Sequence, residues 1–177
     1  MKRSERGFTS LELVVTVAII ALVAGAANIG IFQVLKGTEL SNDYTIAVRQ
    51  AQSAGYWISN DAQMARSIDI GDDPGTADDV EFIIVHWKDW ENGDTHEISY
   101  IWLDSADGLK KLSRKHVTRD KDLVEIGNET TFIADNIYAA TLYEQTGRWS
   151  LTVEARSGNK SETREYEISQ RFNDFEE

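Results

Sequence analysis

An uncharged apolar run close to the N-terminus sets the first limit on how this chain can fold. It covers residues 13–32 and reads LVVTVAIIALVAGAANIGIF. About 20 apolar residues in a helix cover the roughly 30 Å of hydrocarbon in a bilayer. A net basic segment, MKRSERG, precedes the run, and the positive-inside rule keeps such a flank in the cytoplasm. The sequence therefore predicts one membrane-spanning helix whose C-terminal domain lies outside the cytoplasm.

The rest of the chain has the composition of a soluble domain. With 177 residues the chain is long enough for one compact domain and an additional segment, but short for two domains. The formal net charge of -12 opposes contact with the phosphate backbone of nucleic acid, which we do not expect among the partners. The sequence has no cysteine, which excludes disulfides, thiolate metal sites and cysteine nucleophiles.

Charge and hydropathy alone are consistent with two common ways in which such an N-terminal segment is processed. One is a secretory signal peptide that is cleaved at the small residues Ala24-Gly25-Ala26. The other is an uncleaved membrane anchor with a single span. Either fate would leave an exported binding domain, secreted in the first case and tethered to the membrane in the second.

A short motif directly before the apolar run indicates a third fate. Its residues are Gly7-Phe8-Thr9-Ser10-Leu11-Glu12, and they resemble the type IV prepilin signal. In that family a dedicated peptidase cuts after the glycine on the cytoplasmic side and methylates the new N-terminal residue, usually phenylalanine. The resemblance implies cleavage between Gly7 and Phe8, N-methylation of Phe8, and Glu12 as the fifth residue of the mature chain. Many members carry a proline where Ile29 stands here.

A carboxylate at the edge of a membrane helix needs a physical reason. On insertion scales an acidic side chain within such a helix costs roughly 2.5 to 3.5 kcal/mol. The resemblance implies a partner, because in pilin-like filaments this glutamate is thought to pair with the N-terminal amine of a neighbouring subunit. Glu12 would then align the helices in an apolar filament core by a salt bridge. The alternative is a favourable acid in the first helical turn, at the level of the lipid headgroups.

The resemblance and the residue pattern together divide the chain into three parts. They are a leader peptide over residues 1–7, a transmembrane and filament-core helix over 8–36, and a pilin-like globular domain over 37–177. Within the domain, apolar residues spaced by three or four predict an amphipathic helix that continues to about residue 70. These residues are Tyr44, Ala47, Ala51, Ala54, Ile58, Ala62 and Ala65. Because most of them are alanine, we expect another element to approach this face closely.

Short runs of β-branched and aromatic residues follow the helix and predict an antiparallel sheet. The expected strands cover 81–90, 95–103, 109–117, 131–134, 138–145, 148–156 and 163–172, with turns at 105–108, 146–147 and 158–159. A two-residue turn at Asn92-Gly93 would place Trp87 opposite Ile98 and Val85 opposite Tyr100. A long helix packed on such a sheet is an α+β arrangement, and it is the pilin-like fold that the resemblance implies.

No arrangement of residues indicates catalysis, so we do not expect an enzyme. The sequence lacks a nucleophile elbow, a phosphate-binding loop and the spacing of a zinc protease. The predicted hairpin places His86 and His96 on opposite faces of the sheet, so they should not share a metal ion. His116 stands alone in a basic run that is typical of a solvated edge strand.

One acidic segment is the candidate for a bound ion, since calcium prefers several oxygen ligands from a flexible turn. Its residues are Asp72, Asp73, Asp78 and Asp79. The segment lacks the spacing of an EF-hand, and a solvated loop explains the same residues. Apart from calcium we expect no cofactor.

The interpretation that combines the motif, the span and the fold is a structural filament subunit. The extent of the β-rich region, and the segment from Arg49-Gln50-Ala51 to Ala65-Arg66-Ser67-Ile68, resemble the J-type minor pseudopilins of type II secretion and their minor-pilin counterparts. The resemblance implies a prepilin peptidase and N-methyltransferase, other pilins or pseudopilins, an inner-membrane assembly platform and membrane lipid as partners. It implies location in the bacterial inner membrane and then in a filament, in the periplasm or at the cell surface. The machine would be a type IV pilus, a type II secretion system or a competence filament.

Overall fold

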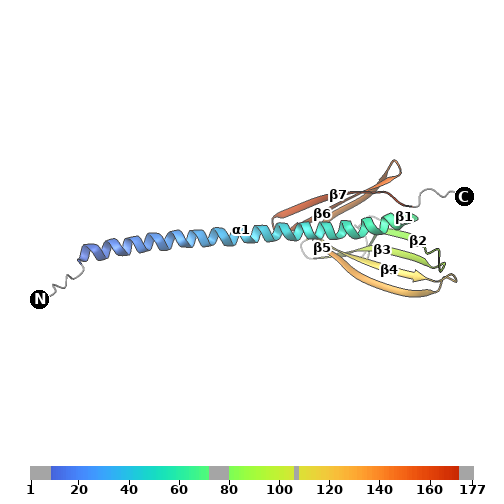
Figure 1. Cartoon of the computed structure of the whole chain (residues 1–177), viewed down its shortest axis with the longest axis horizontal. Helices are drawn as coiled ribbons and strands as arrows, with labels where there is room; N and C mark the ends of the chain where they lie inside the picture. Colours follow the sequence, from blue (N-terminus) through green and yellow to red (C-terminus); the bar gives the residue numbers. More distant parts are fainter. Residues whose placement is uncertain (1–8, 72–79, 106–107, 172–177) are drawn as a thin grey trace. The chain divides into compact units, whose positions relative to one another are not determined.

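The computed structural model describes residues 9–71, 80–105 and 108–171. In these ranges the chain forms one helix followed by seven strands (Figure 1), which confirms the α+β class. The elements are α1 (Ser10–Met64), β1 (Ser67–Ile70), β2 (Val80–Lys88), β3 (Thr95–Asp104), β4 (Lys110–Arg119), β5 (Glu125–Gln145), β6 (Arg148–Ser157) and β7 (Lys160–Ile168). The chain divides into two compact units, Met1–Asn42 and Asp43–Glu177, and α1 contributes residues to both.

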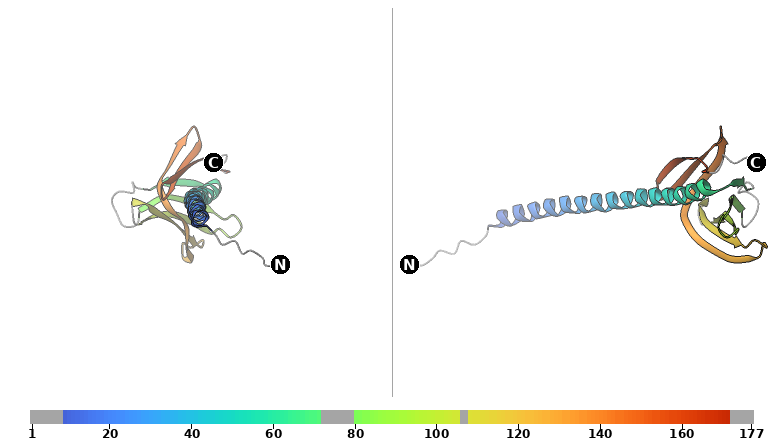
Figure 2. Two further views of the ribbon diagram at one scale, coloured as in Figure 1. Left: turned by 90° about the vertical axis from the view of Figure 1, so that its left-hand side faces the viewer. Right: turned by 45° about the vertical axis from the view of Figure 1, so that its right-hand side comes forward.

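The strands of the second unit form one antiparallel sheet in which each strand pairs with the next one in the sequence. β5 is the longest strand, and it pairs with β4 up to Ile137 and with β6 from Ile137 onward. Asn136 lies at this change of partner with φ of 57°, in the left-handed region. The resulting bend divides the sheet, and Figures 1 and 2 show β2 to β4 and the pair β6–β7 on different sides of the C-terminal part of α1.

Two side chains of α1 hold the bend of β5. Ser53 Oγ donates a hydrogen bond to the Ile133 carbonyl at 2.8 Å, and Gln50 Oε1 accepts one from the N–H of Asp135 at 2.8 Å. The pairing of β4 with β5 is irregular at this point, and buried backbone groups need partners wherever a strand ladder is interrupted. The helix therefore supplies the hydrogen bonds that fix where β5 bends.

The predicted alanine face of α1 is the face that packs on the sheet. Ala47, Ala51, Ala54, Ile58 and Ala62 are fully buried, whereas Tyr44, the first residue of the predicted stripe, is exposed. Their partners in the sheet are buried branched and aromatic side chains, namely Ile83, Val85, Ile98, Tyr100, Leu112, Ile137, Leu151, Val153 and Ile168. Small side chains on one element and large ones on the other allow the close packing of a protein interior.

The helix ends at Met64 rather than near residue 70, and the next residues form β1 at the edge of the sheet. The helical spacing continues through Ala65 and no helix breaker stands before Gly71, so no local pattern predicts that the helix ends at Met64. Long-range hydrogen bonds decide it instead. The N–H of Arg66 donates to the His86 carbonyl at 2.8 Å, and Gln170 Nε2 donates to the Ala65 carbonyl at 3.2 Å.

The register of the β2–β3 hairpin differs from the predicted one by two residues. Trp87 lies opposite His96 rather than Ile98, and Val85 lies opposite Ile98 rather than Tyr100. The connection is longer than two residues, because the N–H of Asp89 donates to the Asp94 carbonyl at 2.8 Å and closes the loop there. A shift of two residues preserves which side chains share a face. The predicted separation of His86 and His96 onto opposite faces is therefore confirmed.

Two predictions for the later strands are wrong. β4 is not an edge strand, because it pairs with both β3 and β5. The strands expected over 131–134 and 138–145 are parts of β5, since the bend at Asn136 redirects the strand without ending it. The predicted turns at 146–147 and 158–159 are confirmed as the connections on either side of β6.

The turn between β5 and β6 gives a first prediction. Thr146 and Gly147 have φ of 52° and 74°, as a type I′ turn requires. A β-branched residue pays a steric cost of about 1 kcal/mol or more in this region, whereas asparagine tolerates it. We expect Thr146→Asn to raise the free energy of unfolding by about 1 kcal/mol, measured by urea titration of the detergent-solubilised chain. Thr146→Val keeps the branch and should give no gain; equal stability of the two variants would contradict the argument.

Candidate functional site

The first turn of α1 is closed by Thr9 and carries Glu12. Thr9 Oγ1 accepts a hydrogen bond from the N–H of Glu12 at 3.4 Å, and the Thr9 carbonyl accepts one from the N–H of Leu13 at 3.2 Å. Threonine three residues before glutamate is the pattern of a capping box. The acid also lies in the turn where the helix dipole favours negative charge. Its carboxylate makes no hydrogen bond or ion pair with the residues that the structure describes.

The helix that continues from this turn exposes apolar side chains on all sides. Leu11, Leu22 and Phe32 are 75, 74 and 72 % exposed. By length and composition α1 can cross a membrane, and its most apolar segment is not buried within the chain. The helix is continuous through Gly25 and Gly30. A helix that is apolar all round needs an apolar surrounding, which is either lipid or other helices.

Polar side chains within this part of α1 find their partners in the helix itself. Thr16 Oγ1 donates to the Glu12 carbonyl at 2.7 Å, and Asn28 Nδ2 donates to the Ala24 carbonyl at 2.9 Å. These bonds allow polar groups to lie in a surrounding without water. An ionised carboxylate has no proton to donate and cannot use the backbone carbonyls in this way. Glu12 therefore needs a donor from outside the described helix or from water.

A buried ion pair joins the C-terminal part of α1 to the sheet. Asp61 is 1 % exposed, and its carboxylate accepts hydrogen bonds from Arg114 Nε at 2.7 Å and Tyr100 Oη at 2.5 Å. The ring of Trp57 lies 5.3 Å from the Arg114 guanidinium. Burial and the Asp61 charge raise the pKa of Tyr100 above its usual range. Burial lowers the pKa of Arg114, but the hydrogen bond and charge of Asp61 outweigh burial and raise it overall. The arrangement fixes the helix on the sheet.

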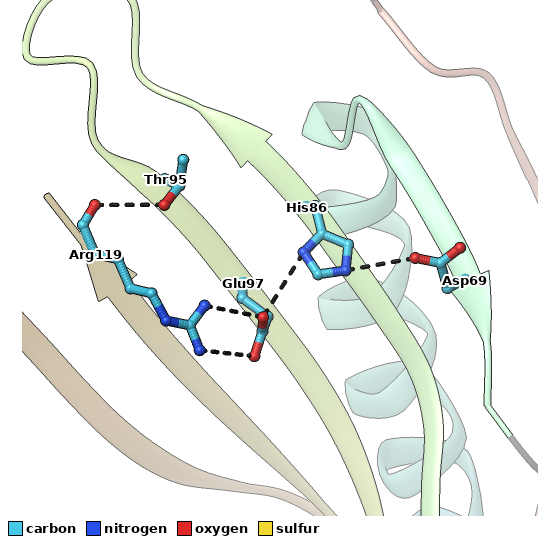
Figure 3. A network of polar contacts seen from close by, with 5 residues as sticks. All are labelled: Asp69, His86, Thr95, Glu97 and Arg119. Atoms are coloured by element: carbon cyan, nitrogen blue, oxygen red, sulfur yellow. Dashed lines mark hydrogen bonds and ion pairs between the residues drawn. The ribbon is translucent and has the colours of Figure 1, made fainter. Parts of the chain in front are cut away.

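Four polar side chains from neighbouring strands contact one another on the face of the sheet away from α1 (Figure 3). His86 Nε2 lies 3.4 Å from Asp69 Oδ2, and His86 Nδ1 lies 4.0 Å from Glu97 Oε2. Arg119 donates to Glu97 at 3.0 Å, and this hydrogen bond lowers the pKa of Glu97. All four side chains are at least 30 % exposed, and such surface pairs contribute little to stability.

A histidine pair lies on the face of the sheet that carries the core. His96 in β3 and His116 in β4 are diagonal neighbours, and His96 Nδ1 is 3.0 Å from His116 Nε2. The ring of Trp87 stacks on His96 at 5.1 Å between centroids with 11° between the planes. Burial and the charges of Arg114 and His96 lower the pKa of His116, which favours a neutral imidazole. The prediction that His116 stands alone is therefore wrong, because His96 lies next to it.

The structure tests the predicted site residues only in part. Gly7 and Phe8, the expected cleavage and methylation positions, lie outside the described residues. The calcium candidates also lie outside them; they are Asp72, Asp73, Asp78 and Asp79. Within the described ranges no group of three or more metal-binding side chains converges. Glu12 is placed in the first turn of α1, but its pairing with another subunit stays a prediction.

Two features of the second unit were missed from the sequence. Asp61 interrupts the alanine face between Ile58 and Ala62, and an acid on a predicted core face was a signal for a buried partner. The contact of His96 with His116 had no such signal. It depends on the pairing of β3 with β4, which residue patterns alone did not reveal.

Comparison of the chain with protein-family models, with curated proteins and with solved structures gives no match.

Proposed function

We propose that this protein is a structural subunit of a type IV pilin-like filament, made with a leader that is cleaved between Gly7 and Phe8. The observation that carries the proposal is Glu12 at the start of an exposed apolar helix. Its carboxylate has no partner in the part of the chain that the structure describes, whereas Thr16 and Asn28 bond within the helix. A helix of this kind is suited first to lipid and then to a bundle of like helices, where a donor from a neighbouring chain would pair with the acid.

The sequence before the helix supports the same proposal. The motif from Gly7 to Glu12 resembles the prepilin signal, and cleavage within it would create a free N-terminal amine on Phe8. An amine is a charged donor that fits an unpaired carboxylate in an apolar surrounding. The mature chain would then carry the amine and the carboxylate of an intermolecular ion pair four residues apart in the sequence, at Phe8 and Glu12.

The partners and the location follow from this assignment. They are a prepilin peptidase that also methylates Phe8, the inner-membrane assembly platform, membrane lipid and other pilins or pseudopilins. The domain from Asp43 onward would lie outside the cytoplasm, in the periplasm or at the cell surface. The narrower assignment is a minor pilin or minor pseudopilin of the J type, on the resemblance of the segment from Arg49 to Ile68 and the extent of the β-rich region.

Replacement of Glu12 tests the pairing. Glu12→Ala should leave membrane insertion intact, because it removes a charge from an apolar helix. Its incorporation into filaments should fall roughly tenfold or more, because the amine of a neighbouring subunit would lose the carboxylate that the proposal pairs with it. Incorporation is measured as the ratio of variant in purified filaments to variant in the membrane fraction, in cells with the complete assembly machine.

Glu39→Ala is the matched control. Glu39 is an exposed acidic residue of α1 that lies in the same unit of the chain as Glu12 but beyond the uncharged run. Its replacement should therefore leave incorporation within twofold of that of the unaltered chain. Normal incorporation of Glu12→Ala would rule out the pairing role. If Glu12→Ala were absent from the filaments and also failed to insert into the membrane, the acid would be needed for insertion and not for pairing. An exported binding domain on a plain anchor would show no incorporation of the unaltered chain either.

A further inference from the structure

The second unit has a groove at the end of α1 that is lined by tryptophans and a histidine. It has a volume of about 840 Å³ and lies between the last turn of α1, the β2–β3 hairpin and the C-terminal segment. Met64, Trp87 and Trp90 give it apolar walls, and His96 is among its lining residues. His96 is therefore reachable from solvent, although it lies on the core face of the sheet.

The two histidines have the spacing of a chelate. Zinc lies about 2.0 to 2.1 Å from a histidine nitrogen, so two nitrogens bound to one ion are about 3 Å apart when they are near a right angle at the metal. His96 Nδ1 and His116 Nε2 are 3.0 Å apart. Thr118 Oγ1 lies 3.3 Å from His96 Nδ1 and adds an oxygen to the same place. Glu129 stands directly opposite His116 in β5 and is an exposed carboxylate.

We propose that His96 Nδ1 and His116 Nε2 chelate a divalent transition-metal ion such as Cu²⁺ or Zn²⁺ that enters from this groove. Imidazole nitrogens suit these ions, and Cu²⁺ has the highest affinity in the first-row series. Within the described ranges no third metal-binding side chain already converges on the pair. Water from the groove fills the remaining positions, which makes the site labile and open.

Binding needs only a small change in the pair. Without a metal, one imidazole donates its N–H to the unprotonated nitrogen of the other. With a metal, both of these nitrogens present lone pairs to the ion, and the former donor carries its proton on its other ring nitrogen. The former donor gives its N–H proton to water in the groove and takes one up from water on its other ring nitrogen, so neither ring gains or loses a proton overall. A rotation of the rings then turns both lone pairs toward the ion. Trp87 stacks on the ring of His96 and keeps this ligand beside His116 while the rings turn.

The chain supplies its own control, since it has three histidines. His86 lies on the opposite face of the same sheet, near Asp69 and Glu97. The full chain is purified in detergent with a tag that lacks histidine, and excess calcium is added to saturate the carboxylates. Cu²⁺ is titrated in the presence of glycine, which competes for weak sites, and binding is followed by tryptophan fluorescence and by equilibrium dialysis.

We expect one Cu²⁺ per chain, with quenching that is largely lost in Trp87→Phe because Trp87 lies against the first ligand. His96→Ala and His116→Ala should each weaken binding by about tenfold or more, in line with the effect of disrupting a metal's ligand environment, while His86→Ala should change it less than twofold. His96→Gln preserves a side-chain hydrogen bond to His116 but removes the imidazole, so it should keep the fold and lose the metal. Unchanged affinity in His96→Gln, or an equal loss in His86→Ala, would overturn the proposal. The result does not depend on filament assembly, so it can fail without affecting the proposed function.

Discussion

Asp61→Ala should lower the free energy of unfolding of the second unit by about 3 to 5 kcal/mol. The aspartate is buried and bonded to both Arg114 and Tyr100. Its removal leaves a guanidinium and a phenol at the helix–sheet interface without their acceptor, and an unpaired buried charge is the costly part. Urea titration of the detergent-solubilised chain, followed by tryptophan fluorescence, measures the loss.

Two controls separate this ion pair from surface charge. Glu167 lies 3.8 Å from Arg148, and both side chains are well exposed, so Glu167→Ala should change stability by no more than about 0.5 kcal/mol. The double variant Asp61→Leu with Arg114→Met replaces both charges by apolar groups and should recover most of the loss. A small effect of Asp61→Ala, similar to that of Glu167→Ala, would mean that the pair does not hold α1 on the sheet.

Gly55→Ala should also destabilise the second unit, by about 1 to 3 kcal/mol. In an open helix this change stabilises by about 1 kcal/mol, because alanine is the better helix former. Here a Cβ at position 55 would overlap the ring of Tyr166, whose hydroxyl donates to the Ala51 carbonyl at 3.4 Å. The overlap forces the ring of β7 away from the helix, so the sign of the effect is reversed. The same urea titration measures it.

The background of Tyr166→Leu provides the test of that mechanism. With the ring gone, Gly55→Ala should become neutral or stabilising, as at an open helical position. A loss of the same size in both backgrounds would show that the cost does not come from Tyr166.

Local sequence patterns predicted the helix and the turns better than they predicted which strands pair with one another. The spacing of Ala47, Ala51 and Ala54 identified the buried face of α1, since helical period and burial are linked directly. The pair Thr146-Gly147 predicted a turn because glycine between two strand-like runs is a local turn signal, and the structure has its connection there. Both inferences depend on residues that are neighbours in the sequence, and both were confirmed.

Errors arose where distant residues decide the outcome. α1 stops at Met64 because β1 finds hydrogen bonds on β2, as the contact of Arg66 with His86 shows. The β2–β3 loop closes at Asp89 and Asp94 instead of forming the tight turn that Asn92-Gly93 favours. The basic residues of β4 are typical of a solvated edge strand, but one of them, Arg114, is paired with Asp61 inside the protein.

The candidate site in the first unit was more predictable from the sequence than the histidine pair in the second unit. The uncharged run and the position of Glu12 could be identified from composition and spacing alone, and the structure places both in one continuous helix. What the acid contacts in a filament depends on other chains. The histidine pair in the second unit required the pairing of β3 with β4 and could only be found in the structure.

The intact mass of the protein from cells that contain a prepilin peptidase tests the central proposal most directly. Cleavage after Gly7 with methylation predicts a chain that begins at N-methyl-Phe8, which a top-down fragmentation spectrum would assign. The measurement requires only purified membranes and does not depend on which machine the filament serves. A chain that still begins at Met1, or one that begins at Ala27 after loss of the apolar segment, would contradict the assignment.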